Sequence, residues 1–303
     1  MLLVFGSINL DIAFDADHLP GAGETVLGRG YRISPGGKGA NQAHAARCDG
    51  MPTQMAGAIG EDGFAASALA GLGQAGVDLS LVQRLPGQTG CAGIVVDARG
   101  ENQIVVAPGV NLALKASHVS DAALARVDTV LLQMETDPAE TAAMAARARR
   151  HGCRVILNNA PARPLPREVL DSLDVLIVNA GELTTTAQAQ GVVVGGPDAQ
   201  AVALATAHRF TVVVTLGANG VLACGPGAGS LRLPAIPVNV VDTTGAGDTF
   251  AGVFAAAQTA GLPLQQALAR ASVAASLSCT RNGAQASQPH RDEIDLALRR
   301  WPS

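Results

Sequence analysis

The chain has 303 residues, of which 48% are hydrophobic and 15% are charged, and its formal net charge is −4. This hydrophobic fraction excludes a wholly disordered protein, and the slightly acidic balance argues against a nucleic-acid-binding surface. No uncharged apolar run has the length of about 18 residues that a membrane span needs, so we expect a cytoplasmic protein that does not bind a membrane.

The rarer residue types narrow the possibilities. The five cysteines are scattered and never form a C-x-x-C pair, which is typical of reduced thiols rather than of disulfides or a zinc site. The chain has two lysines, Lys38 and Lys115, and eight aromatic residues. Few residues could therefore serve a function that needs a lysine or an aromatic stacking surface.

Short apolar runs alternate with alanine-rich segments. Continuous apolar runs are typical of strands buried on both faces of a parallel sheet, and we predict strands at Leu2–Phe5, Val130–Met134, Val155–Leu157, Val175–Val178 and Val212–Leu216. We predict helices at Ala40–Arg47, Phe64–Gln74, Ala139–Arg150, Ala199–His208, Gly247–Ala260, Leu264–Leu277 and Asp292–Arg300, and a loop at Val193–Pro197. This order predicts a doubly wound α/β sheet.

Two segments break the alternation. Residues 9–34 hold strand-like pieces between glycines, and residues 91–107 resemble a hairpin made of Cys91–Val96 and Gln103–Ala107. Both segments are too short to be a domain. We expect them to form a small sheet that projects from the main one as a lid, so that residues 1–303 make a single domain.

Two glycine patterns do not predict nucleotide loops. A literal G-x-G-x-x-G occurs at residues 71–76, but an alanine-rich helix precedes it where a dinucleotide-binding fingerprint requires a strand. We expect a helix that ends in glycine caps. The Gly37-Lys38 pair is followed by Gly39, which excludes a Walker-type phosphate loop.

The most informative motif is Val241–Phe250, which contains Gly245-Ala246-Gly247-Asp248 and runs into a helix. Small residues there let the backbone approach a ligand, and the free N–H groups of the helix N-terminus form an anion-binding site. Beside a phosphoryl group, Asp248 could accept a proton from an attacking hydroxyl. The alternative is that Asp248 only caps the helix.

A second glycine cluster, Ser34–Ala43, also opens a helix and carries Lys38 and Asn41 as donors. Asn9, Asp11 and Glu135 follow predicted strands, and ligands bind at the carboxyl ends of strands in such sheets. Carboxylates and amides there suit the hydroxyl groups of a sugar-like ligand. For each residue alone, a polar turn is an equally good interpretation.

Two further segments follow predicted strands. Asn179 and Glu182 are spaced to hold a hydrated Mg²⁺ or, equally, to form a capping box. The segment Thr215–Gly220 is a strand followed by a glycine turn, which is compatible with a plain hairpin.

Taken together and in this order, these segments resemble ribokinases and the wider PfkB-type carbohydrate kinase family. The resemblance covers nearly the whole chain and includes Gly6–Asn9, Gly23–Val26, Asn158–Pro161 and Arg281–Gln285. It implies a Rossmann-like, three-layer α/β/α sandwich with a small β-sheet lid. In ribokinases two such lids clasp each other, which implies a homodimer.

The resemblance also implies a role for each matched residue. Asp248 would be the general base, and the amides of Gly245, Ala246 and Gly247 would stabilise the transferring phosphoryl group. The sugar would be held by Asn9, Asp11, Gly37, Lys38, Gly39, Asn41, Glu135 and Asp248. ATP would be held by Asn179, Thr215, Gly217, Ala218, Gly220, Gly247 and Ser272, with Glu182 placing Mg²⁺. A K⁺ ion would be held, mostly through backbone carbonyls, by Asp242, Thr244, Ser278, Arg281, Gly283 and Ser287.

The expected activity is ATP-dependent phosphorylation of D-ribose at its 5-hydroxyl. Other pentoses, ketohexoses and nucleosides are alternatives, although Phe14 and Tyr31 are the two aromatic residues in the lid segments, which disfavours a base that needs stacking. A sugar or nucleotide sensor on the same fold need not keep Asp248. A dehydrogenase would need the glycine fingerprint that is misplaced here.

Overall fold

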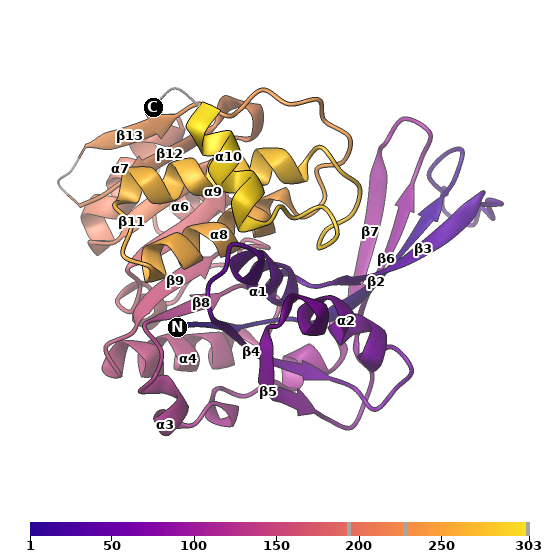
Figure 1. Cartoon of the computed structure of the whole chain (residues 1–303), viewed down its shortest axis with the longest axis horizontal. Coiled ribbons are helices and arrows are strands. Elements are labelled where there is room, and N and C mark those ends of the chain that lie inside the picture. The colour runs from indigo at the N-terminus through magenta and orange to yellow at the C-terminus, as the bar shows by residue number, and fades with distance from the viewer. Residues whose placement is uncertain (193–194, 227–228, 301–303) are drawn as a thin grey trace.

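The computed structural model describes residues 1–192, 195–226 and 229–300, and within them it has two separate β-sheets (Figure 1). The larger sheet has the strand order β13-β12-β11-β10-β9-β8-β1-β4-β5. Neighbours from β11 to β5 are parallel, whereas β12 and β13 add antiparallel at one edge. The strands are β1 (Leu2–Phe5), β4 (Thr53–Ile59), β5 (Asp78–Arg84), β8 (Thr129–Leu132), β9 (Arg154–Asn158), β10 (Val175–Asn179), β11 (Thr211–Thr215), β12 (Val221–Cys224) and β13 (Ser230–Leu233).

Helices cover both faces of this sheet. Side chains alternate along a strand, so Leu2 and Val4 of β1 enter one buried cluster while Leu3 and Phe5 enter the other. The first cluster is closed by α1 (Lys38–Cys48), α2 (Ala65–Ala75), α8 (Ala246–Thr259), α9 (Leu264–Ser278) and α10 (Arg291–Arg300). The second is closed by α3 (Asp121–Leu124), α4 (Pro138–Arg150), α5 (Arg167–Leu170), α6 (Ala180–Ala189) and α7 (Pro197–His208). The expected three-layer α/β/α sandwich is confirmed.

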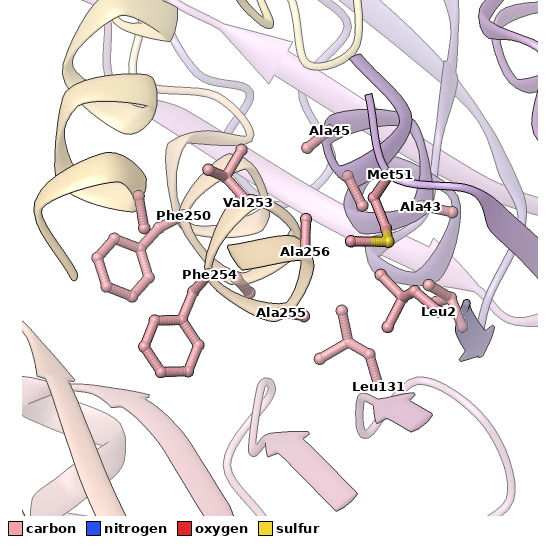
Figure 2. Packing of buried hydrophobic residues seen from close by; sticks show 14 of the residues in the cluster. Leu2, Ala43, Ala45, Met51, Leu131, Phe250, Val253, Phe254, Ala255 and Ala256 are labelled. Atoms are coloured by element: carbon pink, nitrogen blue, oxygen red, sulfur yellow. The ribbon is translucent and has the colours of Figure 1, made fainter. Parts of the chain in front are cut away.

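Helices α1 and α8 pack so closely that their backbones approach each other. Figure 2 shows alanines of both helices in the cluster that also holds Leu2 and Leu131. A side chain at Gly252 of α8 would place its Cβ 2.3 Å from the carbonyl oxygen of Gln42 in α1. The two helices can therefore lie this close because position 252 is glycine.

The smaller sheet stands apart from the main body (Figure 1). Its order is β3-β2-β6-β7, with β2 (Asn9–Asp15) and β6 (Gly90–Val96) parallel at the centre and β3 (Gly30–Gly36) and β7 (Asn102–Ala107) antiparallel at the edges. The two segments predicted to form a lid thus pair into one sheet, as expected. Asn9 and Asp11 lie on one face of β2, a lid strand, and not at the end of the first strand of the main sheet.

The glycine pattern at residues 71–76 is helical. Gly71 and Gly73 lie inside α2, and Gly76 ends that helix in the left-handed conformation with a φ of 76°. The sequence prediction of a glycine-capped helix is confirmed, although two of the glycines are interior. Of the predicted loop Val193–Pro197, Val193 and Val194 lie outside the described residues, and Pro197 begins α7.

Two further predictions concern the surroundings of the chain. All five cysteines carry free thiols. In the described part of the chain, no helix combines the length and the apolar character that a membrane crossing requires.

Candidate active site

Asp248 is buried at the start of α8, with 8% of its surface exposed. Its Oδ2 accepts a hydrogen bond from Asn41 Nδ2 at 3.0 Å, and its Oδ1 accepts one from Gln42 Nε2 at 2.9 Å. The cap position of α8 is Gly245, which makes no side-chain cap hydrogen bond. Asp248 is therefore not the helix cap that the sequence left open, and its carboxylate is instead held between two helices.

The start of α1 lies against the turn that joins β1 to β2. Gly37 has a φ of 86°, and a Cβ there would stand 2.8 Å from the backbone nitrogen of Asn9. A Cβ at Gly39 would stand 2.6 Å from the backbone nitrogen of Ser7. Both glycines are thus required by a close approach of backbone, and this approach brings Lys38 and Asn41 to the sheet edge.

Glu135, just after β8, is tied to the same point. Its Oε2 accepts hydrogen bonds from the backbone N–H of Lys38 at 3.0 Å and from Ser7 Oγ at 2.6 Å. Ser7, which the sequence analysis did not single out, therefore links the first strand to the predicted sugar-binding set.

Charged side chains perturb one another here. Attraction to Asp248 raises the pKa of Lys38, with a further contribution from Glu135, and outweighs the lowering by burial. Burial raises the pKa of Asp11 to about 6, and repulsion from Glu135 and Asp248 adds to this shift. Burial also raises the pKa of Glu182, against the stabilising N–H of Asn179. Several carboxyl groups thus surround one lysine, a pattern typical of functional sites.

Asn9 is oriented by a neighbour that the sequence did not reveal. The buried side chain of Asn111 accepts from the N–H of Ile8 at 2.9 Å and donates to the carbonyl of Ile8 at 3.2 Å. It also donates to Asn9 Oδ1 at 2.8 Å. Because the oxygen of Asn9 accepts this hydrogen bond, its Nδ2 is the group that this side chain can offer as a donor to a further partner.

A cavity of about 560 Å³ opens at the start of α8. It is lined by six of the residues predicted to hold a nucleotide, namely Thr215, Gly217, Ala218, Gly220, Gly247 and Ser272. The predicted hairpin is also real, because β11 and β12 pair on either side of this turn. Further walls that the sequence analysis missed come from Ala235, Ile236, Pro237, Val238, Val240, Phe250, Ala275, Ser276 and Cys279. The apolar lining suits the flat face of a heterocyclic base.

Asn179 and Glu182 form a capping box at the start of α6. Asn179 Oδ1 accepts from the N–H of Glu182, and Glu182 Oε2 accepts from the N–H of Asn179, both at 2.8 Å. Neither residue lines the cavity. The capping interpretation is therefore correct for the local structure, while Glu182 still shares its electrostatic environment with Lys38 and Asp248.

The six residues predicted to hold K⁺ come from the loop before α8 and from the end of α9 with the loop that follows it, and Asp242 ties these two segments together. Asp242 Oδ1 accepts from the N–H and the hydroxyl of Thr244 at 2.9 and 2.6 Å, and its Oδ2 accepts from the N–H of Gly283 at 2.8 Å. Burial raises the pKa of Asp242, but these hydrogen bonds outweigh burial and leave it below its usual value. Nearby, the N–H of Arg281 donates to the carbonyl of Ser278, and Ser287 Oγ donates to the carbonyl of Ala284.

The amides predicted to bind phosphate precede Asp248. The N–H of Ala246 donates to the carbonyl of Thr243 at 3.2 Å, closing the turn. No hydrogen bond between described residues uses the N–H of Gly245 or Gly247. Two of the three amides thus remain available to an anion.

Comparison with known proteins matches residues 1–291 to the model of the pfkB family carbohydrate kinases. The Bacillus subtilis ribokinase is 36% identical over 300 residues, which cover 98% of this chain and 99% of the relative. The Salmonella typhi deoxyribokinase is 31% identical, with 98% of each protein covered. The structure of the Arabidopsis thaliana ribokinase complexed with ribose and ATP superposes with a TM-score of 0.90 at 33% identity, covering 99% of both chains.

The raised pKa of Asp11 predicts a pH-dependent stability. The folded state holds the proton of this carboxyl more tightly than the unfolded state does. The free energy of unfolding therefore falls as the pH rises from 3.8 to about 6. The Asp11→Asn variant lacks this ionisation. Its stability relative to the parent protein should therefore rise across that window, as measured by urea denaturation below, within and above it. A difference that does not change with pH would contradict the assigned environment.

Proposed function

Because this chain belongs to the pfkB family of carbohydrate kinases, we propose that it transfers the γ-phosphoryl group of ATP to the 5-hydroxyl of D-ribose. The observation that carries the proposal is the buried Asp248 carboxylate, which two side chains at the start of α1 hold and which directly follows Gly247, a residue that lines the cavity. The identity to ribokinases over nearly the full length supports ribose as the sugar.

In the proposed reaction Asp248 accepts the proton of the sugar hydroxyl. The hydroxyl oxygen forms a bond to the γ-phosphorus while the bond from that phosphorus to the bridging oxygen breaks, and ADP leaves with the electron pair. The N–H groups at the start of α8 and the helix dipole stabilise the charge on the transferring group. Gly245 and Gly247 supply two of these amides, and Ala246 would join them if its turn opens.

The sugar lies over the start of α1 in this proposal. Asp11 and Glu135 accept from its hydroxyl groups, whereas Asn9, Asn41 and Lys38 donate to them. Gly37 and Gly39 add backbone groups. The lid sheet carries Asn9 and Asp11, so closure of the lid would bring them onto the sugar and exclude water. We further propose that residues 1–303 act as one kinase domain with this lid.

ATP takes the cavity beside α8. Its base would contact the apolar wall and Ser272, while Thr215, Gly217, Ala218 and Gly220 border its ribose and phosphates. Asn179, which does not line the cavity, would meet the phosphates at the end of β10. The volume of about 560 Å³ lies within the usual range for a small-molecule site, roughly 300–1,000 Å³.

The residues present fit a hydrated Mg²⁺ that arrives with ATP. Among the described residues no group of three or more His, Cys, Asp or Glu side chains could hold a metal ion by itself. Mg²⁺ commonly keeps several waters and binds through one carboxylate and the substrate phosphates. We propose Glu182 for that role, because its carboxyl group is close enough to Lys38 and Asp248 for their charges to shift its pKa. The ion would neutralise charge on the phosphates.

A K⁺ ion fits between the loop before α8 and the segment that begins at the end of α9, which Asp242 joins. The Asp242 oxygens already accept three hydrogen bonds, so the ion would rest on backbone carbonyls of these two segments, including those of Thr244, Ser278, Arg281, Gly283 and Ser287. Such an ion would order the turn before α8 and act on the phosphate site at a distance.

The lid also supports a homodimer. Ile12 pairs with Ile33 and Phe14 with Tyr31 across β2 and β3, so these apolar side chains share one face. Phe14, Tyr31 and Ile33 are exposed, as is Val105 on the same face of β7. We propose that a second lid covers this face. We place the enzyme in the cytoplasm, in keeping with its five free thiols.

The substrate is tested by measuring ADP release with D-ribose, 2-deoxyribose, other pentoses, ketohexoses and nucleosides, with and without K⁺. We expect the highest kcat/KM with D-ribose and activation by K⁺. A preference for 2-deoxyribose or a nucleoside would overturn the assignment within the family. If none of the tested sugars is phosphorylated, a sensor is favoured instead of a kinase. If the rate does not change with K⁺, the proposed K⁺ site is wrong.

The general base is tested by Asp248→Asn. This change keeps the shape of the side chain but removes its basicity, so we expect turnover to fall by about 100-fold or more, with sugar and ATP still bound. Calorimetric titration measures binding and a coupled assay measures turnover. Near-normal turnover would show that another group takes the proton.

The dimer is tested by Val105→Glu, with Leu296→Glu as the matched control. Val105 is 75% exposed on the lid and Leu296 is 52% exposed on α10. Burying a charge in an apolar interface is unfavourable, so light scattering should show a monomer for Val105→Glu and a dimer for the control. A monomeric parent protein, or the same result for both variants, would refute this interface.

A further inference from the structure

Gln42 contacts Asp248 but lies too deep to meet a substrate. Its side chain is fully buried in α1, behind the carboxylate, and both of its amide hydrogens are used. Nε2 donates to Asp248 Oδ1 at 2.9 Å and to Asn158 Oδ1 at 3.0 Å. Gln42 follows Asn41 directly in the chain, yet the sequence analysis assigned it no role.

The orientation of the Gln42 amide is fixed by a chain of other amides. Gln133 Nε2 donates to Gln42 Oε1 at 2.7 Å, and Asn158 Nδ2 donates to the backbone carbonyl of Ile177 at 3.1 Å. If the Gln42 amide were turned over, its oxygen would face the oxygens of Asp248 and Asn158, and its nitrogen would face the donor of Gln133. Each of these contacts would be repulsive.

This chain ends on a rigid element. Ile177 belongs to β10, a central strand of the main sheet, and Asn158 ends the neighbouring β9. Asp248 therefore has one donor on each oxygen, and each comes from α1. Gln42 connects its Asp248 oxygen to the central sheet, whereas Asn41, which holds the other oxygen, accepts a hydrogen bond from Gln285 Nε2 at 3.1 Å.

We propose that Gln42 is a positioning residue that fixes the rotation of the Asp248 carboxylate through this buried amide chain. The proposal rests on the proposed function, in which Asp248 is the general base. Without Gln42, Asn41 still donates its hydrogen bond to Oδ2 of Asp248. With only this one hydrogen bond, the carboxylate is free to rotate. The oxygen that takes the proton then loses its alignment with the sugar hydroxyl. Displacements of about 1 Å can cost about 100-fold in rate.

The test is Gln42→Met, because methionine keeps the length of the side chain but cannot make these hydrogen bonds. We expect kcat to fall by about 100-fold, while the KM values for sugar and ATP change by less than about twofold. A loss of folded enzyme would lower the apparent kcat in proportion to the inactive fraction, so kcat is calculated from the concentration of active sites, measured by calorimetric titration with ATP.

A matched control lies outside the site. Gln54 on β4 is also buried, and its Nε2 donates to a carboxylate, Asp78 Oδ2 at 2.9 Å, and to Ser80 Oγ at 3.0 Å. Gln54→Met therefore removes the same kind of contact and should leave kcat unchanged. If Gln42→Met does not fold, Gln133→Met removes the partner that orients Gln42 and should lower kcat in the same pattern to a smaller extent.

The outcomes separate this proposal from the proposed function. A parent protein with no sugar kinase activity would refute the proposed function. The positioning role would then be decided by crystal structures, in which Gln42→Met should rotate the Asp248 side chain. An unmoved carboxylate, an unchanged kcat in an active enzyme, or an equal loss of kcat in Gln54→Met would overturn the role of Gln42.

Discussion

The close approach of α1 to α8 is the constraint on which the rest of the site depends. Gly252 lets the backbone of the two helices meet, and Gly37 and Gly39 let α1 meet the turn after β1. Both approaches are needed for Asn41 and Gln42 to reach Asp248 across 206 residues or more of sequence. These glycines therefore determine how closely the side chains of Asn41, Gln42 and Asp248 approach one another. The first turns of α1 and α8 are therefore held rigidly against each other, and the separate lid sheet can close over them.

The same packing brings the charged side chains of the site close together. Lys38 lies among carboxyl groups, where its charge opposes the rise in the pKa of Asp11 and of Glu182 that burial causes, and the same neighbours raise the pKa of Lys38. Asp11 stands out because its pKa is raised to about 6. A bound sugar with its hydroxyl donors would satisfy such carboxylates. A site of this kind is costly to the empty protein and suited to a ligand that supplies the missing hydrogen bonds, which is a common property of functional sites.

Local features of this chain could be predicted from the sequence, and long-range ones could not. The apolar runs of β1, β8, β9, β10 and β11 and the glycine motifs are local signals, and the structure confirms the elements they predict. Strand β4 is fully buried but reads Thr-Gln-Met-Ala-Gly-Ala-Ile, too poor in large apolar residues to be detected. The partners Asn111, Gln133 and Gln285 come from segments 91 to 244 residues away from the residues they contact. The capping box of Asn179 with Glu182 shows that one motif can have a correct local explanation and leave its functional role open.

In the proposed reaction, the Asp248 carboxylate meets the primary hydroxyl of the sugar in line with the terminal phosphate of ATP. The most direct measurement is a crystal structure with D-ribose and a non-hydrolysable ATP analogue. It should place an Asp248 oxygen roughly 2.6–3.2 Å from the 5-hydroxyl, with the terminal phosphate of the analogue opposite it near the Gly247 N–H. A 5-hydroxyl held by Asp11 or Glu135, with Asp248 turned away from it, would contradict the account.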